Sequence, residues 1–237
     1  MRVAVVGYGK MGREVEAALR ARGHEPVIAA RGQAFPTACP VGIDFTRPDA
    51  VEANVAAALG AGARYVVGTT GWQDRLPAVA ALVERHQGGL VWAANFSLGV
   101  NLFYRVVREA ASLLARFPEY DPYILERHHR QKKDAPSGTA RALAGILSAS
   151  GSRRSQPETR LEGAIADDHF HVAAVRAGGI VGDHTVGFDS GGDEILLEHR
   201  ARTRAGFAQG SVLAAEWIAG KSGVHEFAAA LDDLVRG

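Results

Sequence analysis

The chain has 237 residues, of which 47% are hydrophobic and 22% are charged, and its formal net charge is +1. This length and composition are typical of a globular protein of one or two domains, and the near-neutral charge argues against general binding to nucleic acid or to membrane surfaces. Cys39, the one cysteine, cannot form an intrachain disulfide and belongs to no metal-binding pattern, which fits a reducing cytoplasm. Glycines interrupt the first apolar run, and no run approaches the roughly 18 residues of a membrane span, so we expect neither a signal peptide nor a membrane segment.

Short apolar runs alternate with amphipathic segments through the first part of the chain, which is the pattern of βαβ units. The expected strands cover 2–6, 26–30, 41–45, 65–67 and 90–94, and the expected helices cover 11–22, 49–59 and 76–86. We therefore predict an α/β protein whose N-terminal domain, residues 1–97, is a doubly wound, Rossmann-type, dinucleotide-binding unit.

The pattern changes after Gly99. We expect a long helix over 100–115, a strand over 123–126, a helix over 139–148 and a surface loop over 151–158. Strands at 170–176, 181–188 and 194–200 are separated by glycine-rich turns, which indicates a meander in a mixed, largely antiparallel sheet. The sequence thus predicts a second, α+β domain over 98–207, followed by helices at 207–218 and 225–235 that periodicity assigns to neither domain.

The run GYGKMG, residues 7–12, directly follows the first expected strand and opens a helix. In a G-x-G-x-x-G loop the glycines allow the tight turn, the approach of a pyrophosphate and close helix–strand packing, while the helix N-terminus faces the negative charge. This context favours dinucleotide binding over a purely structural turn.

The residue that would bind a ribose 2′-hydroxyl is expected about 20 positions further on, at the end of the second strand. No carboxylate stands there, and the residues at that point are Ala29, Ala30 and Arg31. Arg31 suits a 2′-phosphate, which favours NADPH over NADH, whereas the alternative is that it is only a solvated loop residue.

Two more strands end in small or polar residues at the edge where such sheets bind ligands. The segments at these two strand ends are GTTG at 68–71 and AANF at 93–96. Each leaves room for a nicotinamide ring, although each is also compatible with ordinary turn chemistry.

The run HHRQKKDAPSGTA, residues 128–140, gathers basic side chains before an expected helix start. Its SGT backbone N–H groups, a helix dipole and nearby cations form a site suited to a carboxylate. His128 and His129 follow an extended segment, so their side chains are expected on opposite sides, and histidine moves protons near neutrality. The alternative is a solvated basic loop that caps a helix.

With the preceding residues the run becomes ERHHRQKKDAPSGTA, which closely resembles the signature of the 4-hydroxy-tetrahydrodipicolinate reductase family of the diaminopimelate route to lysine. GYGKMG, GTTG, AANFSLGVN and VRAGGIVGDHTVGF occur in the order expected for that family. The resemblance implies NADPH- or NADH-dependent reduction of a cyclic imine dicarboxylate to tetrahydrodipicolinate. It also implies a cytoplasmic homotetramer joined through the second domain, with C-terminal helices 208–237 returning to the first domain.

Matched by position, the resemblance implies that His128 is the general acid/base and that Lys132 is the proton donor. The implied substrate-binding residues are His129, Ser137, Gly138 and Thr139. The implied cofactor-binding residues are Gly7, Tyr8, Gly9, Lys10, Met11, Gly12, Arg31, Gly68, Thr69, Thr70, Ala93, Ala94, Asn95 and Phe96. Ala30 stands where many members have an acidic residue, which weakens the case for NADH.

Two other functions stay open. One is a related two-domain dehydrogenase acting on another anionic substrate, such as an amino acid or a semialdehyde, and the other is a regulatory module that binds NADPH without turnover. His169 and His171 share one face of a strand, but no third ligand signal accompanies them and we predict no metal site. His184 and His199 are expected to be structural.

Overall fold

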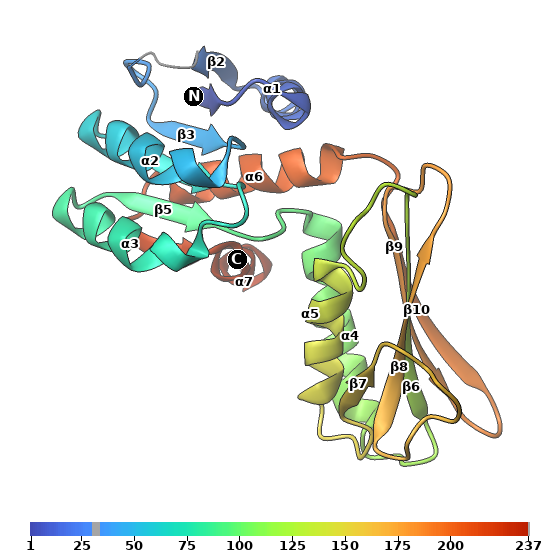
Figure 1. Ribbon diagram of the computed structural model, residues 1–237. Coiled ribbons are helices and arrows are strands. Elements are labelled where there is room, and N and C mark those ends of the chain that lie inside the picture. The colour runs from blue at the N-terminus through green and yellow to red at the C-terminus, as the bar shows by residue number, and fades with distance from the viewer. Residues whose placement is uncertain (30–33, 237) are drawn as a thin grey trace. The chain divides into compact units, whose positions relative to one another are not determined.

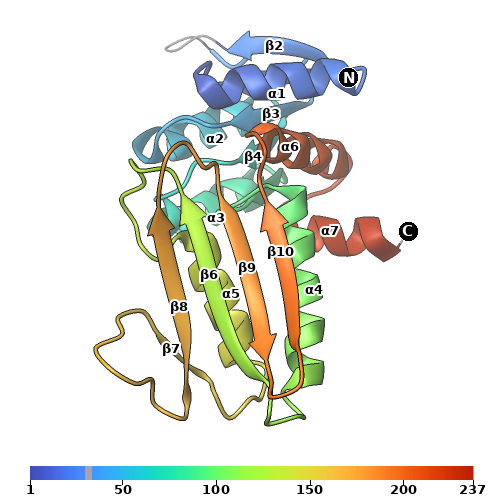
Figure 2. The same cartoon turned by 90° about the vertical axis from the view of Figure 1, so that its right-hand side faces the viewer.

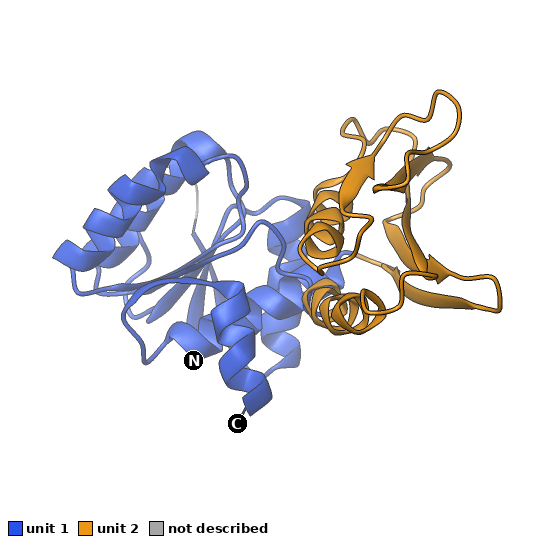
Figure 3. Ribbon diagram, turned by 90° about the horizontal axis from the view of Figure 1, so that it is seen from below, with its two compact units in different colours: residues 1–98, 204–237 blue, residues 99–203 orange. Residues whose placement is uncertain are grey.

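The computed structural model describes residues 1–29 and 34–236, and the chain forms two compact units. Unit 1 consists of residues 1–98 and 204–237, and unit 2 consists of residues 99–203 (Figure 3). Among the described residues, no helix is long and apolar enough to span a membrane.

Unit 1 contains a six-stranded parallel sheet with the strand order β11-β5-β4-β3-β1-β2 (Figure 1). Its strands are β1 (Arg2–Val6), β2 (Glu25–Ala29), β3 (Val41–Asp44), β4 (Arg64–Val67), β5 (Gly89–Trp92) and β11 (Gly223–Glu226). Its helices are α1 (Lys10–Ala21), α2 (Val51–Gly60), α3 (Leu76–Arg85), α6 (Ala205–Ile218) and α7 (Phe227–Arg236), with short 3₁₀ turns at Pro48–Ala50 and Gln73–Arg75. The predicted Rossmann-type class is confirmed.

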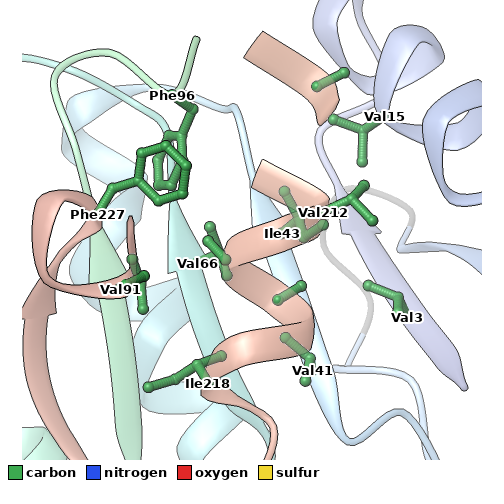
Figure 4. Close-up of a cluster of buried hydrophobic side chains, with 14 of the residues drawn as sticks. Val3, Val15, Val41, Ile43, Val66, Val91, Phe96, Val212, Ile218 and Phe227 are labelled. Atoms are coloured by element: carbon green, nitrogen blue, oxygen red, sulfur yellow. The ribbon is translucent and has the colours of Figure 1, made fainter. Parts of the chain in front are cut away.

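Helices cover both faces of this sheet. Val66 belongs to the core beneath α1 and α6, whereas the next residue, Val67, belongs to the core beneath α2 and α3. Side chains alternate along a strand, so a strand covered on both faces is buried along its whole length, as β3 is. Figure 4 shows the first core, in which Val212 and Ile218 of α6 lie with Val41 of the sheet.

The chain returns to unit 1 after unit 2. Helix α6 packs against α1 and over β3, β4 and β5. Strand β11 then extends the sheet beside β5, with Val224 opposite Leu90. The sequence prediction missed this strand and started a helix at 225, whereas α7 begins at Phe227. A short edge strand contains too few residues for its periodicity to differ from the first turn of a helix.

Unit 2 contains a five-stranded mixed sheet with the order β10-β9-β6-β8-β7. Its strands are β6 (Asp121–His128), β7 (Gln156–Glu158), β8 (His169–Arg176), β9 (Asp183–Asp189) and β10 (Glu194–Arg200). Helices α4 (Leu98–Leu114) and α5 (Gly138–Ser148) lie behind the sheet in Figure 2 and pack on it through Val107, Leu143, Ile124 and Val186.

The mixed sheet is as predicted, but two details of the prediction are wrong. Residues 151–158 are not all loop, because β7 pairs with β8 there. The expected meander is also interrupted, since β6 lies between β8 and β9 and pairs parallel with β8 and antiparallel with β9. Helix α5 supplies the crossover that a parallel β6–β8 pair requires, and local patterning does not reveal such a pairing.

Candidate active site

The glycine loop of unit 1 has the shape that a bound dinucleotide requires. Gly7 has φ +89°, and a Cβ there would lie 2.7 Å from Cγ2 of Thr46. A Cβ on Gly12 would lie 2.2 Å from the Gly7 carbonyl oxygen, whereas a Cβ on Gly9 would meet nothing within 4 Å. Gly7 and Gly12 are therefore needed for packing, and Gly9 leaves open space for a pyrophosphate.

Helix α1 begins directly after this loop. Its N-cap is Gly9, no side chain caps it, and no acidic residue occupies its first turn. Its first N–H groups have no acceptor within the helix, and with the helix dipole they suit an anion. Lys10 and Tyr8 are exposed, with the Tyr8 hydroxyl donating to Glu16, while Met11 packs against the core.

A buried carboxylate organises the neighbouring strand ends. Asp44 ends β3 with no exposed surface. It accepts hydrogen bonds from Thr46 N at 2.7 Å, Thr46 Oγ1 at 2.6 Å and Thr69 Oγ1 at 3.2 Å. Asn54 Nδ2 at 2.9 Å and the Tyr65 hydroxyl at 3.1 Å also donate to it. The loop that touches Gly7 is thus tied to the strand end that carries Thr69.

The GTTG run follows β4 at the same edge of the sheet, because all these strands are parallel. A Cβ on Gly68 would lie 2.2 Å from the Phe45 ring, so this residue must be glycine. Thr69 accepts from Thr46 N at 2.8 Å, and Thr70 is exposed.

The AANF run follows β5 and reaches this edge as well. Ala93 is half-buried and Ala94 is exposed. Asn95 Oδ1 accepts from Ser97 N at 2.8 Å, and buried Phe96 packs against Phe45 and Phe227. The expected cofactor residues 7–12, 68–70 and 93–96 therefore lie at strand ends of one sheet edge, while Arg31 lies outside the described residues.

In unit 2 the basic motif connects the end of β6 to the start of α5. Ser137 is the N-cap of α5, and its Oγ accepts from Ala140 N at 3.1 Å. Gly138 and Thr139 open the helix, where N–H groups have no acceptor within the helix. The Ser137 N–H, which we expected to contribute to the carboxylate site, donates instead to Glu126 Oε1 at 3.1 Å.

His128 is buried and in ionic contact with Glu126. Its Nδ1 contacts Oε2 of Glu126, and these two buried atoms have no other partner among the described residues. Arg176 of β8 donates to Oε1 of Glu126 at 2.6 Å. Burial lowers the pKa of His128, and Lys132 and Arg176 lower it further, although the Glu126 carboxylate opposes them. The pKa of His128 therefore lies below the usual histidine value, and the neutral imidazole is favoured.

His184 of β9 packs edge-on against His128, with ring centroids 5.1 Å apart. Its Nε2 lies 3.3 Å from Ser137 Oγ. Since that oxygen already accepts from Ala140, its hydrogen can go to a neutral imidazole. Burial lowers the pKa of His184 to about 4, with the charge of His128 as the next cause, which keeps this ring neutral. His184 therefore contacts the candidate site, which the expectation of a merely structural role did not anticipate.

Lys132 forms an ion pair with Asp134 in the segment after β6. Its Nζ donates to Asp134 Oδ1 at 2.8 Å, and Arg141 lies 3.7 Å from the same carboxylate. His129 follows β6 and is half-buried, in contrast to His128.

One carboxylate and two imidazoles of this cluster, from Glu126, His128 and His184, lie within 4.8 Å of one another. Both oxygens of Glu126 are already engaged by Arg176, Ser137 and His128. Arg176 and the Ser137 N–H contact Oε1 of Glu126, whereas Oε2 contacts His128 Nδ1.

Sequence reasoning assigned no role to Glu126, Arg176 or Asp44. Glu126 had a readable signal: it precedes His128 by two residues on a strand, which puts both side chains on one face. No signal in the sequence pointed to Arg176, because only the pairing of β6 with β8 brings this residue to Glu126.

A glycine loop suited to a dinucleotide on unit 1, and a buried histidine beside a helix start suited to an anion on unit 2, are features expected of an NAD(P)H-dependent oxidoreductase. The family model for the N-terminus of dihydrodipicolinate reductase matches residues 24–96, and the model for its C-terminus matches residues 99–231. The chain belongs to the dihydrodipicolinate reductase family.

Individual relatives agree with this assignment. A 4-hydroxy-tetrahydrodipicolinate reductase from Christiangramia forsetii is 33% identical over 245 residues and covers 100% of both chains. One from Methanoculleus marisnigri is 42% identical over 180 residues, which cover 76% of this chain and 70% of that protein. The solved structure of a dipicolinate-bound dihydrodipicolinate reductase from Paenisporosarcina sp. TG-14 has a TM-score of 0.73 at 25% identity, covering 97% of this chain and 98% of that chain.

Proposed function

We propose that this protein reduces 4-hydroxy-tetrahydrodipicolinate to tetrahydrodipicolinate in the lysine and diaminopimelate pathway of the cytoplasm. One observation carries the proposal: the basic motif folds so that a buried Glu126–His128 pair adjoins the helix start at Ser137. A dianionic cyclic imine requires that combination of a carboxylate site and a group that exchanges protons.

The helix start and the cations around it bind the substrate. Gly138 and Thr139 present backbone N–H groups to one carboxylate, supported by the helix dipole. His129 and the exposed side chain of Arg130 face the other charged part of the ring. Binding a carboxylate here draws the Lys132 ammonium group away from Asp134, its present partner.

The nicotinamide cofactor, bound at the glycine loop, supplies the hydride that reduces the ring after water is lost. His128, as the acid/base, exchanges the proton that accompanies loss of the ring hydroxyl through its Nε2 atom, since its Nδ1 faces Glu126. The Lys132 Nζ gives its proton to the reduced ring. The balance is one hydride and one proton added and one water released.

We infer that NADPH is the preferred cofactor and that NADH is used less well. β2 ends at Ala29 without a carboxylate for a ribose 2′-hydroxyl, and Arg31 follows in the sequence. For Arg31→Ala we expect NADPH to bind about tenfold more weakly with NADH little changed, measured by fluorescence titration of both cofactors. Equal losses for the two cofactors would reject this role of Arg31.

We infer a homotetramer that associates through the uncovered face of the unit 2 sheet. Helices α4 and α5 cover the face that carries Ile124, whereas Val175 and Leu196 lie on the other face with 42% and 49% exposure. An antiparallel or mixed sheet with apolar side chains on its open face is suited to contact another copy.

The test of the activity is a coupled assay. Pyruvate, aspartate semialdehyde and the upstream synthase generate the substrate, and oxidation of NADPH or NADH is followed by absorbance. We expect synthase-dependent oxidation by this protein. No turnover with either cofactor, while cofactor still binds, would leave the regulatory module as the better description, and turnover only with other amino acids would favour a related dehydrogenase.

A further inference from the structure

The Glu126 carboxylate lies at the junction of the acid/base histidine and the substrate-carboxylate loop. It has no exposed surface, and it stands two residues before His128 on β6, whose burial alternates along the strand. The two side chains therefore lie on the same face, the one covered by α4 and α5.

Its two oxygens contact different parts of the site. Oε1 accepts from the Ser137 backbone N–H at 3.1 Å and from Arg176 at 2.6 Å, while Oε2 contacts His128 Nδ1. Arg176 also donates to the carbonyl oxygen of Asp134 at 2.7 Å, so the same ion pair holds the loop that precedes Ser137. One carboxylate thus links β6, β8 and the first residue before α5.

Neighbouring groups compensate the negative charge of the Glu126 carboxylate. Burial raises its pKa, but Arg176, His128 and the Ser137 N–H outweigh burial, so the pKa of Glu126 lies below its usual range. The group is an anion at neutral pH. An ionised carboxylate in such a buried position persists only when it is paired and hydrogen-bonded.

The contact decides which nitrogen of His128 exchanges protons. With Nδ1 directed at a carboxylate, Nδ1 bears a proton and Nε2 is left for the substrate side. Gly182 stands opposite Nε2, where a Cβ would lie at 2.9 Å, so a side chain there would crowd that nitrogen. Three other charged or titratable groups face His128: Arg176 on β8, His184 on β9 and Lys132 in the following loop. Arg176 and Lys132 disfavour protonation of His128, whereas His184 is neutral.

We propose that Glu126 is a positioning residue for the reductase reaction, which orients His128 through Nδ1 and at the same time anchors the Ser137 end of the carboxylate-binding loop. The inference rests on the proposed function for the role of His128. The acid/base group and the anion site are consequently coupled through one side chain, and removing its charge affects both.

The first test is the variant Glu126→Gln, with Glu109→Gln as the matched control. Glu109 is an exposed residue of α4 in the same unit, so this control removes the same charge away from the site. NMR titration of the His128 ring, assigned with His128→Asn, reports its pKa without substrate. We expect the pKa to fall by about one pH unit in Glu126→Gln and to stay unchanged in the control.

The second readout separates positioning from folding. We expect kcat to fall about 10- to 100-fold with the KM for cofactor unchanged, and the acidic limb of the pH–rate profile to move to lower pH. We also expect dipicolinate, used as the binding probe, to bind about tenfold more weakly because Ser137 loses its anchor. An unchanged His128 pKa together with unchanged dipicolinate affinity would overturn the proposal.

Glu126→Gln leaves the half-buried cation of Arg176 without its ion-pair partner and can therefore prevent folding. The double variant Glu126→Gln/Arg176→Met removes both charges and relieves that cost. A folded double variant with wild-type kcat and wild-type dipicolinate affinity would refute the proposal. If the wild-type protein shows no reductase turnover, the proposed function fails, while the pKa and dipicolinate measurements still decide whether Glu126 couples the two groups.

Discussion

Lys132, the proposed proton donor, is paired with a carboxylate of the protein itself. Its ammonium group lies 2.8 Å from Asp134, in a half-buried position close to the helix start at Ser137. In the proposed function, this ion pair keeps the side chain close to the helix start at which a substrate carboxylate would bind. The proposed function requires substrate to replace Asp134 as the partner of Lys132.

For Lys132→Ala we expect kcat to fall by about 100-fold or more, with cofactor affinity intact, because the reduced ring loses its proton donor. Steady-state kinetics and fluorescence titration of NADPH measure the two effects. Lys132→Arg keeps the charge and the pair with Asp134, but a guanidinium does not release a proton near neutrality. Full activity of Lys132→Arg would show that this position only binds anions.

His184 makes the stability of the protein depend on pH. Its pKa is lowered from 6.5 to about 4 by burial first and by the His128 charge second, so folding favours the neutral ring. That contribution is present above the ordinary histidine pKa and is lost as pH falls through the folded value. Between pH 6.5 and pH 4 we expect the free energy of unfolding to drop by up to roughly 3 kcal/mol from this group.

Urea denaturation at a series of pH values tests this expectation. His184→Gln should flatten the pH dependence in that interval, whereas His86→Gln, which changes an exposed histidine after α3, should leave it as in the wild type. If the free energy of unfolding of His184→Gln varied with pH as it does in the wild type, His184 would not be the source of the pH dependence.

At the level of elements, the ends of β3 and β4 are joined by the Asp44 network. Asp44 accepts from the backbone and hydroxyl of Thr46 and from the hydroxyl of Thr69, one on each strand end. Tyr65, whose pKa is raised well above its usual value by burial and by this carboxylate, donates from within β4. The network holds the β3 loop against Gly7, and so it supports the shape of the dinucleotide loop.

For Asp44→Asn we expect NADPH affinity to fall about tenfold and the free energy of unfolding to fall by about 2–4 kcal/mol, because an amide nitrogen would face buried donors. Fluorescence titration and urea denaturation measure the two losses. Asp49→Asn changes an exposed residue that follows the same strand and is ion-paired to Arg47, and serves as the control. A variant with unaltered cofactor affinity would show that the network is structural alone.

For the whole molecule, the two units differ in how their sheets are covered. The sheet of unit 1 has helices on both faces, whereas the sheet of unit 2 has helices on one face and carries Val175 and Leu196 on the other. A sheet of the second kind meets water or another subunit, and apolar exposed positions favour the subunit.

We expect Leu196→Asp to shift the protein from the proposed tetramer to smaller species, because a carboxylate would be buried in the proposed contact. Analytical ultracentrifugation measures the distribution of species. Leu234→Asp on α7 is a matched control, since both leucines have 49% exposure. If both variants sediment like the wild type, the open face is not the contact between subunits.

Local patterns in the sequence were sufficient for several features. Spacing and composition reveal features that depend on residues near one another in the chain. These are the GYGKMG loop between a strand and a helix, the alternation of strands and helices in unit 1, and the start of a helix after the basic motif. For the same reason His128 and the helix start after it were found together.

Features that depend on strand pairing required the tertiary structure. Arg176 reaches Glu126 only because β6 pairs with β8, and His184 reaches His128 only because β9 lies on the other side of β6. Strand order and register arise from contacts between distant segments, which no local pattern encodes. The residues of the motif could therefore be identified from the chain, whereas the charged groups that surround His128 were decided by the fold.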